Sequence, residues 1–345
     1  MPSILKLPDL WRVIREMDLE AIRRDAEGRF RILILAPSRA EAEAAALLLT
    51  GEDAPHPWLE ALTPDDLDPA GGGVGTLTAA LLVSTSADLT SGLARAADGL
   101  RRAHVPIVTV VHGPTRAVDG VVQPTSRLVA AARAGEAART LVAALDADGL
   151  EKIAEALVRT VPPSARLALA RQLPPLRDAV FDQLIDETAK ANATYAFTAA
   201  LAEAVPVLDV PLNVADILIL TKNQLLMGYK IALGAGKSGR ARDVIGEVIG
   251  VVGGGFLFRQ AARGLIGLIP VAGLIPKVAI AYTGTWAIGR AVAVWATEGR
   301  RLSPSAVRRF SRDAAGRGRD FARQLVSSRR ERRRLASGGG PAEAQ

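Results

Sequence analysis

The sequence predicts an α/β domain with a small parallel sheet, followed by an all-α region. Short apolar runs alternate with helix-like segments up to about residue 133, as in βαβ units. Strand-like runs then stop, and the remaining chain has the pattern of helices. The 345 residues are 49% hydrophobic and 23% charged, which is enough apolar material for two domains with separate cores.

Five regions follow one another along the chain. An amphipathic helix from Asp9 to about Glu27 comes first, because Asp9 can cap it and its apolar residues share one face. The predicted regions are the N-terminal helix at 1–29, the α/β domain at 30–133, a helical connector at 134–204, an apolar helical domain at 205–302, and a basic amphipathic helix with a disordered tail at 303–345.

Within the α/β domain, the strands are predicted from runs that are apolar on both faces. The expected strands are 30–35, 78–84 and 106–111, and the expected helices between them are 40–50 and 89–103. The segment from Gly51 to Gly75 is rich in Pro, Asp and Gly and is predicted to be loop.

Proline pairs divide the helical connector. Pro162-Pro163 and Pro174-Pro175 are expected at helix boundaries, because proline cannot continue the hydrogen bonding of a helix interior. A further helix is predicted to begin at Asn213 and to end at Gly234.

The strand, turn and helix from residue 31 to Gly51 have the spacing that a Ras-like GTPase has around its phosphate loop. That loop needs G-x-x-x-x-G-K-[ST], in which glycine N–H groups and a lysine hold phosphate and a hydroxyl holds magnesium. The corresponding positions here are Ala36, Glu41, Ala42 and Glu43. The two carboxylates would repel a triphosphate, so the phosphate grip is absent.

The base-reading motif is also absent. The strand 106–111 is followed by His112-Gly113-Pro114-Thr115, where a GTPase of this kind carries Asn-Lys-x-Asp. His112 and Thr115 are therefore degenerate base-reading positions, and no cofactor, GTP included, is expected.

Other patterns are predicted to be structural. Asp68 to Gly71 matches the bare pattern D-x-x-G and is predicted to be a solvated turn after a Thr63 cap. The literal Gly236-Lys237-Ser238 lacks the first glycine and a preceding strand, so it is predicted to be a helix-ending loop. Three scattered histidines and no cysteine predict neither a metal site nor a catalytic residue.

The most apolar part of the chain lies between residues 244 and 296. Its cleanest windows are 264–276 and 278–289, which are separated by Lys277. We expect this part to associate with a membrane, as a transmembrane helix or as a hairpin lying in the bilayer. The expected lipid-facing residues are Leu265, Ile269, Leu274, Ile280 and Trp286. The alternative is the buried core of a soluble helical domain.

Positive charge is concentrated near the end of the chain. Residues 300–334 hold thirteen arginines and three acidic residues, a net charge of +10, whereas the whole protein carries +7. A basic amphipathic helix after an apolar region favours anionic lipid headgroups over nucleic acid as the partner. The predicted headgroup-binding residues are Arg308, Arg312, Arg319 and Arg323.

Residues 205–300 resemble the domain of unknown function found in YcjF-type inner-membrane proteins. The positions that carry the resemblance are Pro211, Asp216, Gln224, Met227, Gly253, Gly254, Arg259, Pro270, Gly273, Tyr282 and Gly289. The resemblance implies a helical, membrane-associated module, which in that family often follows a Ras-like GTPase domain.

The favoured interpretation is a non-catalytic pseudo-GTPase scaffold or partner-binding protein at the cytoplasmic membrane, with its bulk on the cytoplasmic side. It would form a homo-oligomer or pair with an intact GTPase. One alternative is a GTP-binding protein with an unorthodox phosphate loop, formed by backbone near 36–41 or by the run Gly71 to Gly75. The other is a soluble helical oligomer that binds nucleic acid through its arginine-rich tail.

Overall fold

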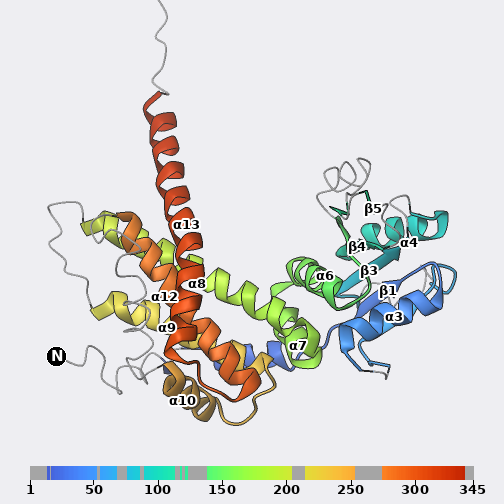
Figure 1. The fold of residues 1–345 in the computed structure, drawn as a ribbon, viewed down its shortest axis with the longest axis horizontal. Helices are drawn as coiled ribbons and strands as arrows, with labels where there is room; N and C mark the ends of the chain where they lie inside the picture. Colours follow the sequence, from blue (N-terminus) through green and yellow to red (C-terminus); the bar gives the residue numbers. More distant parts are fainter. Residues whose placement is uncertain are drawn as a thin grey trace, which may run out of the picture. The chain divides into compact units, whose positions relative to one another are not determined.

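Figure 1 shows the computed structural model of the chain. It describes residues 14–15, 17–52, 55–67, 76–85, 89–112, 117–118, 121–122, 138–203, 214–252 and 274–338. The chain forms two compact units. The α/β unit is Glu20–Gln183 with Leu233–Gly236, and the helical unit is Met1–Leu19, Leu184–Ala232 and Lys237–Gln345. The predicted order, α/β first and all-α second, is confirmed.

The α/β unit is built on a five-stranded, fully parallel sheet with the order β2-β1-β3-β4-β7. The strands are β1 (Ile32–Leu35), β2 (Leu59–Leu62), β3 (Ala79–Ser84), β4 (Ile107–Val111) and β7 (Ala138–Val142). This is the 2-1-3-4-5 order of doubly wound folds, in which the strand order reverses beside β1. A separate antiparallel pair joins β5 (Ala117–Val118) to β6 (Val121–Val122).

Helices cover both faces of the sheet. Alternate residues of β1 point to opposite faces, so Ile32 and Ile34 join one core cluster while Leu33 and Leu35 join another. The first cluster contains side chains of α3 (Arg39–Thr50), α6 (Ala147–Thr160) and α7 (Pro163–Gln172), and the second contains side chains of α4 (Ser91–Arg102). Because both faces are covered, the central strands β1, β3 and β4 are buried along their whole length.

Two strands contradict the sequence-based prediction. The segment predicted to be loop contains β2, and the part predicted to be all-helical after residue 133 begins with β7. Both strands lie at the two edges of the sheet. The residues of β2 are half-buried or exposed and none is β-branched, so pairing with β1 rather than local propensity makes this segment a strand.

The helix ends carry the side chains and backbone conformations typical of caps. Ser38 caps α3 at its start, and Gly51 ends it with a left-handed φ of 68°. Thr90 caps α4 and Asp146 caps α6. The two proline pairs fall where predicted, because α6 ends at Thr160, α7 starts at Pro163, and a short 3-10 helix, η2 (Pro174–Leu176), separates α7 from α8 (Arg177–Glu203).

The predicted continuous first helix is wrong. Of that segment the structure describes residues 14–15 and 17 onward, and the backbone bends at Met17 before α2 (Leu19–Ala26) begins. The Met17 N–H bonds to the carbonyl of Ile14, and the Leu19 N–H to that of Met17, so the helical ladder is interrupted.

The helical unit contains most of α8 together with α9 (Val214–Gly234), α10 (Ala241–Val252), α12 (Leu274–Glu298) and α13 (Pro304–Gly338). Glycines let these helices pack closely. A Cβ at Gly228 would lie 2.6 Å from Val248, one at Gly289 2.5 Å from Ile185, and one at Gly318 3.1 Å from the carbonyl oxygen of Ala279. Gly318 therefore brings α13 against the backbone of α12.

Side-chain amides join three helices inside this unit. The Asn192 Nδ2 group of α8 and the Gln224 Nε2 group of α9 both donate to Thr285 Oγ1 of α12, at 3.0 and 3.2 Å. Asn223 Nδ2 donates to Asn192 Oδ1 at 2.8 Å. Asn192 and Thr285 are fully buried, so each hydrogen bond compensates a group removed from water.

The expectation of a transmembrane helix is wrong for the described residues. No helix among them combines the length and the apolarity needed to cross a bilayer. Although α12 has 25 residues, it carries Lys277, Arg290 and two buried threonines, and these lower its hydropathy. Much of the second predicted window, residues 278–289, is buried in the helical unit.

Candidate functional site

Open parallel sheets bind ligands beyond the carboxyl ends of their strands, at the point where the strand order reverses. Here that point lies between β1 and β3, so the residues that follow β1 form the candidate site. Ala36 is the first of them. Its side chain is fully buried in the core, and its N–H donates to the carbonyl of Leu62 at 3.3 Å, which fixes the turn into α3.

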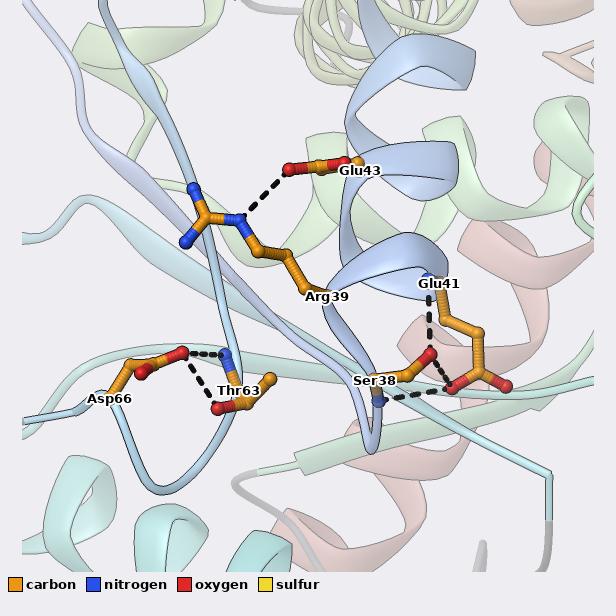
Figure 2. Close-up of polar contacts among 6 residues, drawn as sticks. All are labelled: Ser38, Arg39, Glu41, Glu43, Thr63 and Asp66. Carbon is orange, nitrogen blue, oxygen red and sulfur yellow. Dashed lines mark hydrogen bonds and ion pairs between the residues drawn. The ribbon is translucent and has the colours of Figure 1, made fainter.

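The start of α3 is closed by its own side chains (Figure 2). The Glu41 N–H donates to Ser38 Oγ at 3.3 Å. In return, Glu41 Oε2 accepts the Ser38 N–H at 3.2 Å and the Ser38 hydroxyl at 2.8 Å. This is a complete capping box. The Glu41 carboxylate thus occupies the first turn of the helix, where a nucleotide-binding protein places a phosphate.

His112 lies on the other side of this carboxylate. It follows β4 directly, and its backbone N–H donates to the carbonyl of Ser84 at the end of β3, at 2.8 Å. His112 Nε2 is 3.7 Å from Glu41 Oε1, which is too long for a hydrogen bond but close enough for attraction when the imidazole is protonated. The side chains are 20% and 28% exposed.

The structure therefore brings together two residues that the sequence assigned to different nucleotide motifs. Glu41 stands at a predicted phosphate position and His112 at a predicted base-reading position, and they face one another. Thr115, the other degenerate base-reading position, lies outside the described residues, as do Asp68 to Gly71.

The other predicted phosphate positions lie elsewhere on α3. Ala42 is fully buried in the core. Glu43 points away from the start of the helix and accepts a hydrogen bond from Arg39 Nε at 2.9 Å, on a face where both side chains are more than half exposed (Figure 2). Of the two predicted carboxylates, only Glu41 lies at the helix N-terminus.

A tight turn follows β2, at the carboxyl-terminal end of the sheet where α3 also begins. Asp66 Oδ2 accepts the Thr63 N–H at 3.3 Å and the Thr63 hydroxyl at 2.7 Å (Figure 2). These hydrogen bonds stabilise the carboxylate and lower the pKa of Asp66. Sequence reasoning identified Thr63 as a cap and missed Asp66 as its partner, although T-x-x-D is the spacing that this turn requires.

Hollows open on the part of the α/β unit that the structure describes. One, of about 570 Å³, lies between residues 64–67 and α4 and is lined in part by Asp65, Arg95 and Asp98. Another, of about 630 Å³, lies between α3 and the edge strand β2. Among the residues that the structure describes, no group of three or more His, Cys, Asp or Glu could hold a metal ion.

The predicted lipid-facing residues separate into three groups. Leu265 and Ile269 lie outside the described residues. Leu274 is half-buried and Ile280 is 45% exposed on α12. Trp286 is only 5% exposed, because its ring stacks on Tyr282 and lies under the guanidinium of Arg317, 3.7 Å from the ring centre.

Tyr282 connects this aromatic contact to α8. Its hydroxyl donates to Asp186 Oδ1 at 2.6 Å, and Lys190 Nζ lies 2.6 Å from Asp186 Oδ2. Burial, followed by the hydrogen bond to Asp186, raises the pKa of Tyr282. Tyr282 therefore stays protonated and links α8 to α12.

The four predicted headgroup-binding arginines all lie on α13. Arg308, Arg312 and Arg323 are exposed and Arg319 is half-buried. The literal Gly236-Lys237-Ser238 ends α9 as predicted. The Lys237 N–H bonds to the carbonyl of Ala232 and the Gly236 N–H to that of Leu233, with Gly236 at a φ of 94°.

No protein-family model matches the chain, and a search of curated proteins finds no match to it.

Proposed function

We propose that this protein is a non-catalytic, membrane-associated scaffold or partner-binding protein whose α/β unit is a pseudo-GTPase. In this proposal the α/β unit keeps the strand, turn and helix spacing of a Ras-like domain and has lost nucleotide binding. The helical unit corresponds to the YcjF-type module and associates with the cytoplasmic face of the cytoplasmic membrane. The partner is a second copy of the chain or an intact GTPase.

The capping box of α3 is the observation that carries the proposal. A phosphate at a helix N-terminus needs backbone N–H groups that point outward and a site free of negative charge. Here the Ser38 and Glu41 N–H groups are bonded to side chains of the same turn, and the Glu41 carboxylate brings its own negative charge. A phosphate would have to displace that carboxylate and its hydrogen bonds.

A nucleotide titration tests the proposal. Purified full-length protein is titrated with GTP, and separately with ATP, in the presence of Mg²⁺, by calorimetry. We expect no saturable heat for the wild-type chain. Stoichiometric binding at micromolar affinity would contradict the proposal and favour a GTP-binding protein with an unorthodox phosphate loop.

Two single variants show whether the carboxylate at the helix start matters. Glu41→Ala removes the carboxylate of the capping box. Glu43→Ala removes a carboxylate two residues further along α3, on the exposed face of the helix. Weak nucleotide binding gained by Glu41→Ala alone would identify the capped turn as a former phosphate site. Equal gains by both variants would point instead to a general reduction of negative charge.

A further inference from the structure

Six arginines of α13 recur with a period of eleven residues. They form three pairs with the same internal spacing of four residues: Arg308 and Arg312, Arg319 and Arg323, and Arg330 and Arg334. The sequence assigned the first two pairs to lipid headgroups and did not assign the third. The structure shows one unbroken helix from Pro304 to Gly338, so all three pairs stand on a single rigid element (Figure 1).

The period places the six side chains on one side of the helix. An α-helix turns about 100° per residue, so eleven residues return to within about 20° of the starting direction. The pairs are about 16 Å apart along the axis, and the row from Arg308 to Arg334 is about 39 Å long. We call this row the arginine stripe.

The arginine stripe lies beside the packed face of α13, about a third of a turn round the helix from it. The buried residues of the helix follow their own row against α12: Val307, Ser311, Ala314, Ala315, Gly318 and Ala322. Five of the six stripe arginines are exposed and Arg319 is half-buried. Because α12 covers the small-residue face, the charged row lies on the exposed flank of α13 next to that face.

The acidic residues of α13 do not interrupt the row. Asp313, Asp320 and Glu331 lie about a quarter turn further round the helix. Asp320 pairs with Arg323, whose guanidinium lies 3.3 Å from the carboxylate while the arginine side chain remains 68% exposed. The stripe thus keeps a strong excess of positive charge.

We propose that the arginine stripe is a peripheral binding surface for anionic lipid headgroups, on which α13 lies flat. This inference rests on the proposed membrane association and names the surface that makes it. A straight row about 39 Å long can place all six guanidinium groups on a planar layer of negative charge at the same time. The contact is electrostatic, since the buried face of α13 is occupied by α12.

The shape of the stripe favours a planar surface over a nucleic acid. A duplex turns once in about 34 Å, so each phosphate strand winds away from a straight row of that length. Single strands are held by stacking on exposed aromatic rings. The two aromatic residues of α13 are occupied, because Phe310 packs beside Val307 and Leu302 and Phe321 contacts Tyr282.

Vesicle co-sedimentation tests the stripe. Full-length protein is mixed with vesicles of phosphatidylcholine alone and with vesicles that also contain phosphatidylserine. Each arginine near an anionic surface strengthens binding about fivefold, so Arg319→Gln with Arg323→Gln should weaken binding about 25-fold. The Arg319→Lys, Arg323→Lys double variant keeps the charge and should bind like the wild type.

A matched control removes two arginines outside the stripe. Arg301 precedes α13 and Arg332 lies on another side of the helix, and both are exposed. Their double replacement by glutamine makes the same change in net charge and should weaken binding less than about threefold, because more distant charges are screened. Circular dichroism of each variant checks that the helix content is unchanged.

Three results would overturn the proposal. They are equal losses for stripe and control variants, equal binding to both vesicle types, and a stripe-dependent affinity for duplex DNA or RNA without binding to vesicles. None of these results bears on nucleotide binding, so failure of the stripe remains distinguishable from failure of the pseudo-GTPase proposal, which the GTP titration decides.

Discussion

Replacement of Asn192 by alanine is expected to destabilise the helical unit by about 3 kcal/mol. Asn192 is fully buried on α8 and makes two side-chain hydrogen bonds, one to Thr285 of α12 and one from Asn223 of α9. Alanine removes both bonds and leaves the Asn223 amide without its acceptor.

The magnitude follows from three contributions. Each lost hydrogen bond costs about 1 kcal/mol net, and an unsatisfied polar group in a partly buried place adds about 1 kcal/mol more. Thr285 keeps its bond from Gln224 and its own bond to the carbonyl of Ala281, so its desolvation is still compensated. A double-mutant cycle of Asn192→Ala with Thr285→Val should show a coupling energy of about 1 kcal/mol.

Urea unfolding followed by tryptophan fluorescence measures this change. The chain has four tryptophans, and two of them, Trp286 and Trp295, lie on α12. In a Trp11→Phe, Trp58→Phe background, the signal therefore reports the helical unit, which matters because two units need not unfold in one transition. Thr198→Ala is the control, because this exposed hydroxyl bonds only within its own helix.

A loss of less than about 0.5 kcal/mol for Asn192→Ala would refute the reasoning, since surface substitutions reach that size. If Asn192→Ala lowers stability as expected but shows no coupling energy with Thr285→Val, the hydrogen-bond network would be refuted and the destabilisation would be attributed to the burial of Asn192 alone.

Three further sets of substitutions test the α/β unit. Ser38→Ala should cost about 1 kcal/mol in urea unfolding, whereas Ser38→Asp should cost less because it can still cap the helix. Gly149→Ala should lower the free energy of unfolding by about 3 kcal/mol or more, because the new Cβ would lie 1.9 Å from the carbonyl oxygen of Ala144. Gly99→Ala is the control: its Cβ would lie in open space, and alanine should stabilise the helix by up to about 1 kcal/mol. Thr63→Ala should raise the pKa of Asp66 towards its ordinary value of 3.8 in an NMR titration. The pKa of Asp66 is lower in the folded than in the unfolded protein, so its contact with Thr63 stabilises the fold at pH values above the unfolded pKa. That stabilisation is lost as the pH falls through the folded pKa. An unchanged Asp66 titration in Thr63→Ala would exclude the contact.

The sequence predicted those strands and helix ends that are determined by residues close together in the chain. The central strands β1, β3 and β4 are apolar on both faces, and the proline pairs at 162–163 and 174–175 stop helices wherever they occur. The capping box of Ser38 and Glu41 was also readable, because S-x-x-E before an apolar run is its signature. Sequence reasoning compared these positions with a phosphate loop and therefore missed the cap.

The edge strands could not be predicted in this way. The residues of β2 and β7 include glutamate, arginine and alanine, and their extended conformation depends on hydrogen bonds to β1 and β4, which are distant in sequence. The meeting of Glu41 and His112 is another example, since 71 positions along the chain separate two side chains that lie 3.7 Å apart.

The sequence by itself determined the order of an α/β part and a helical part, the absence of the nucleotide-binding residues and the concentration of arginine near the end of the chain. These properties follow from amino-acid composition and from patterns among residues that are neighbours in the sequence. Only the tertiary structure decided that Glu41 meets His112, that Trp286 is covered by Arg317 and Tyr282, and that α13 buries small residues against α12 while most of its arginines stay exposed. These features depend on which residues far apart in the sequence pack together and exclude water, and the packing of the whole unit determines that.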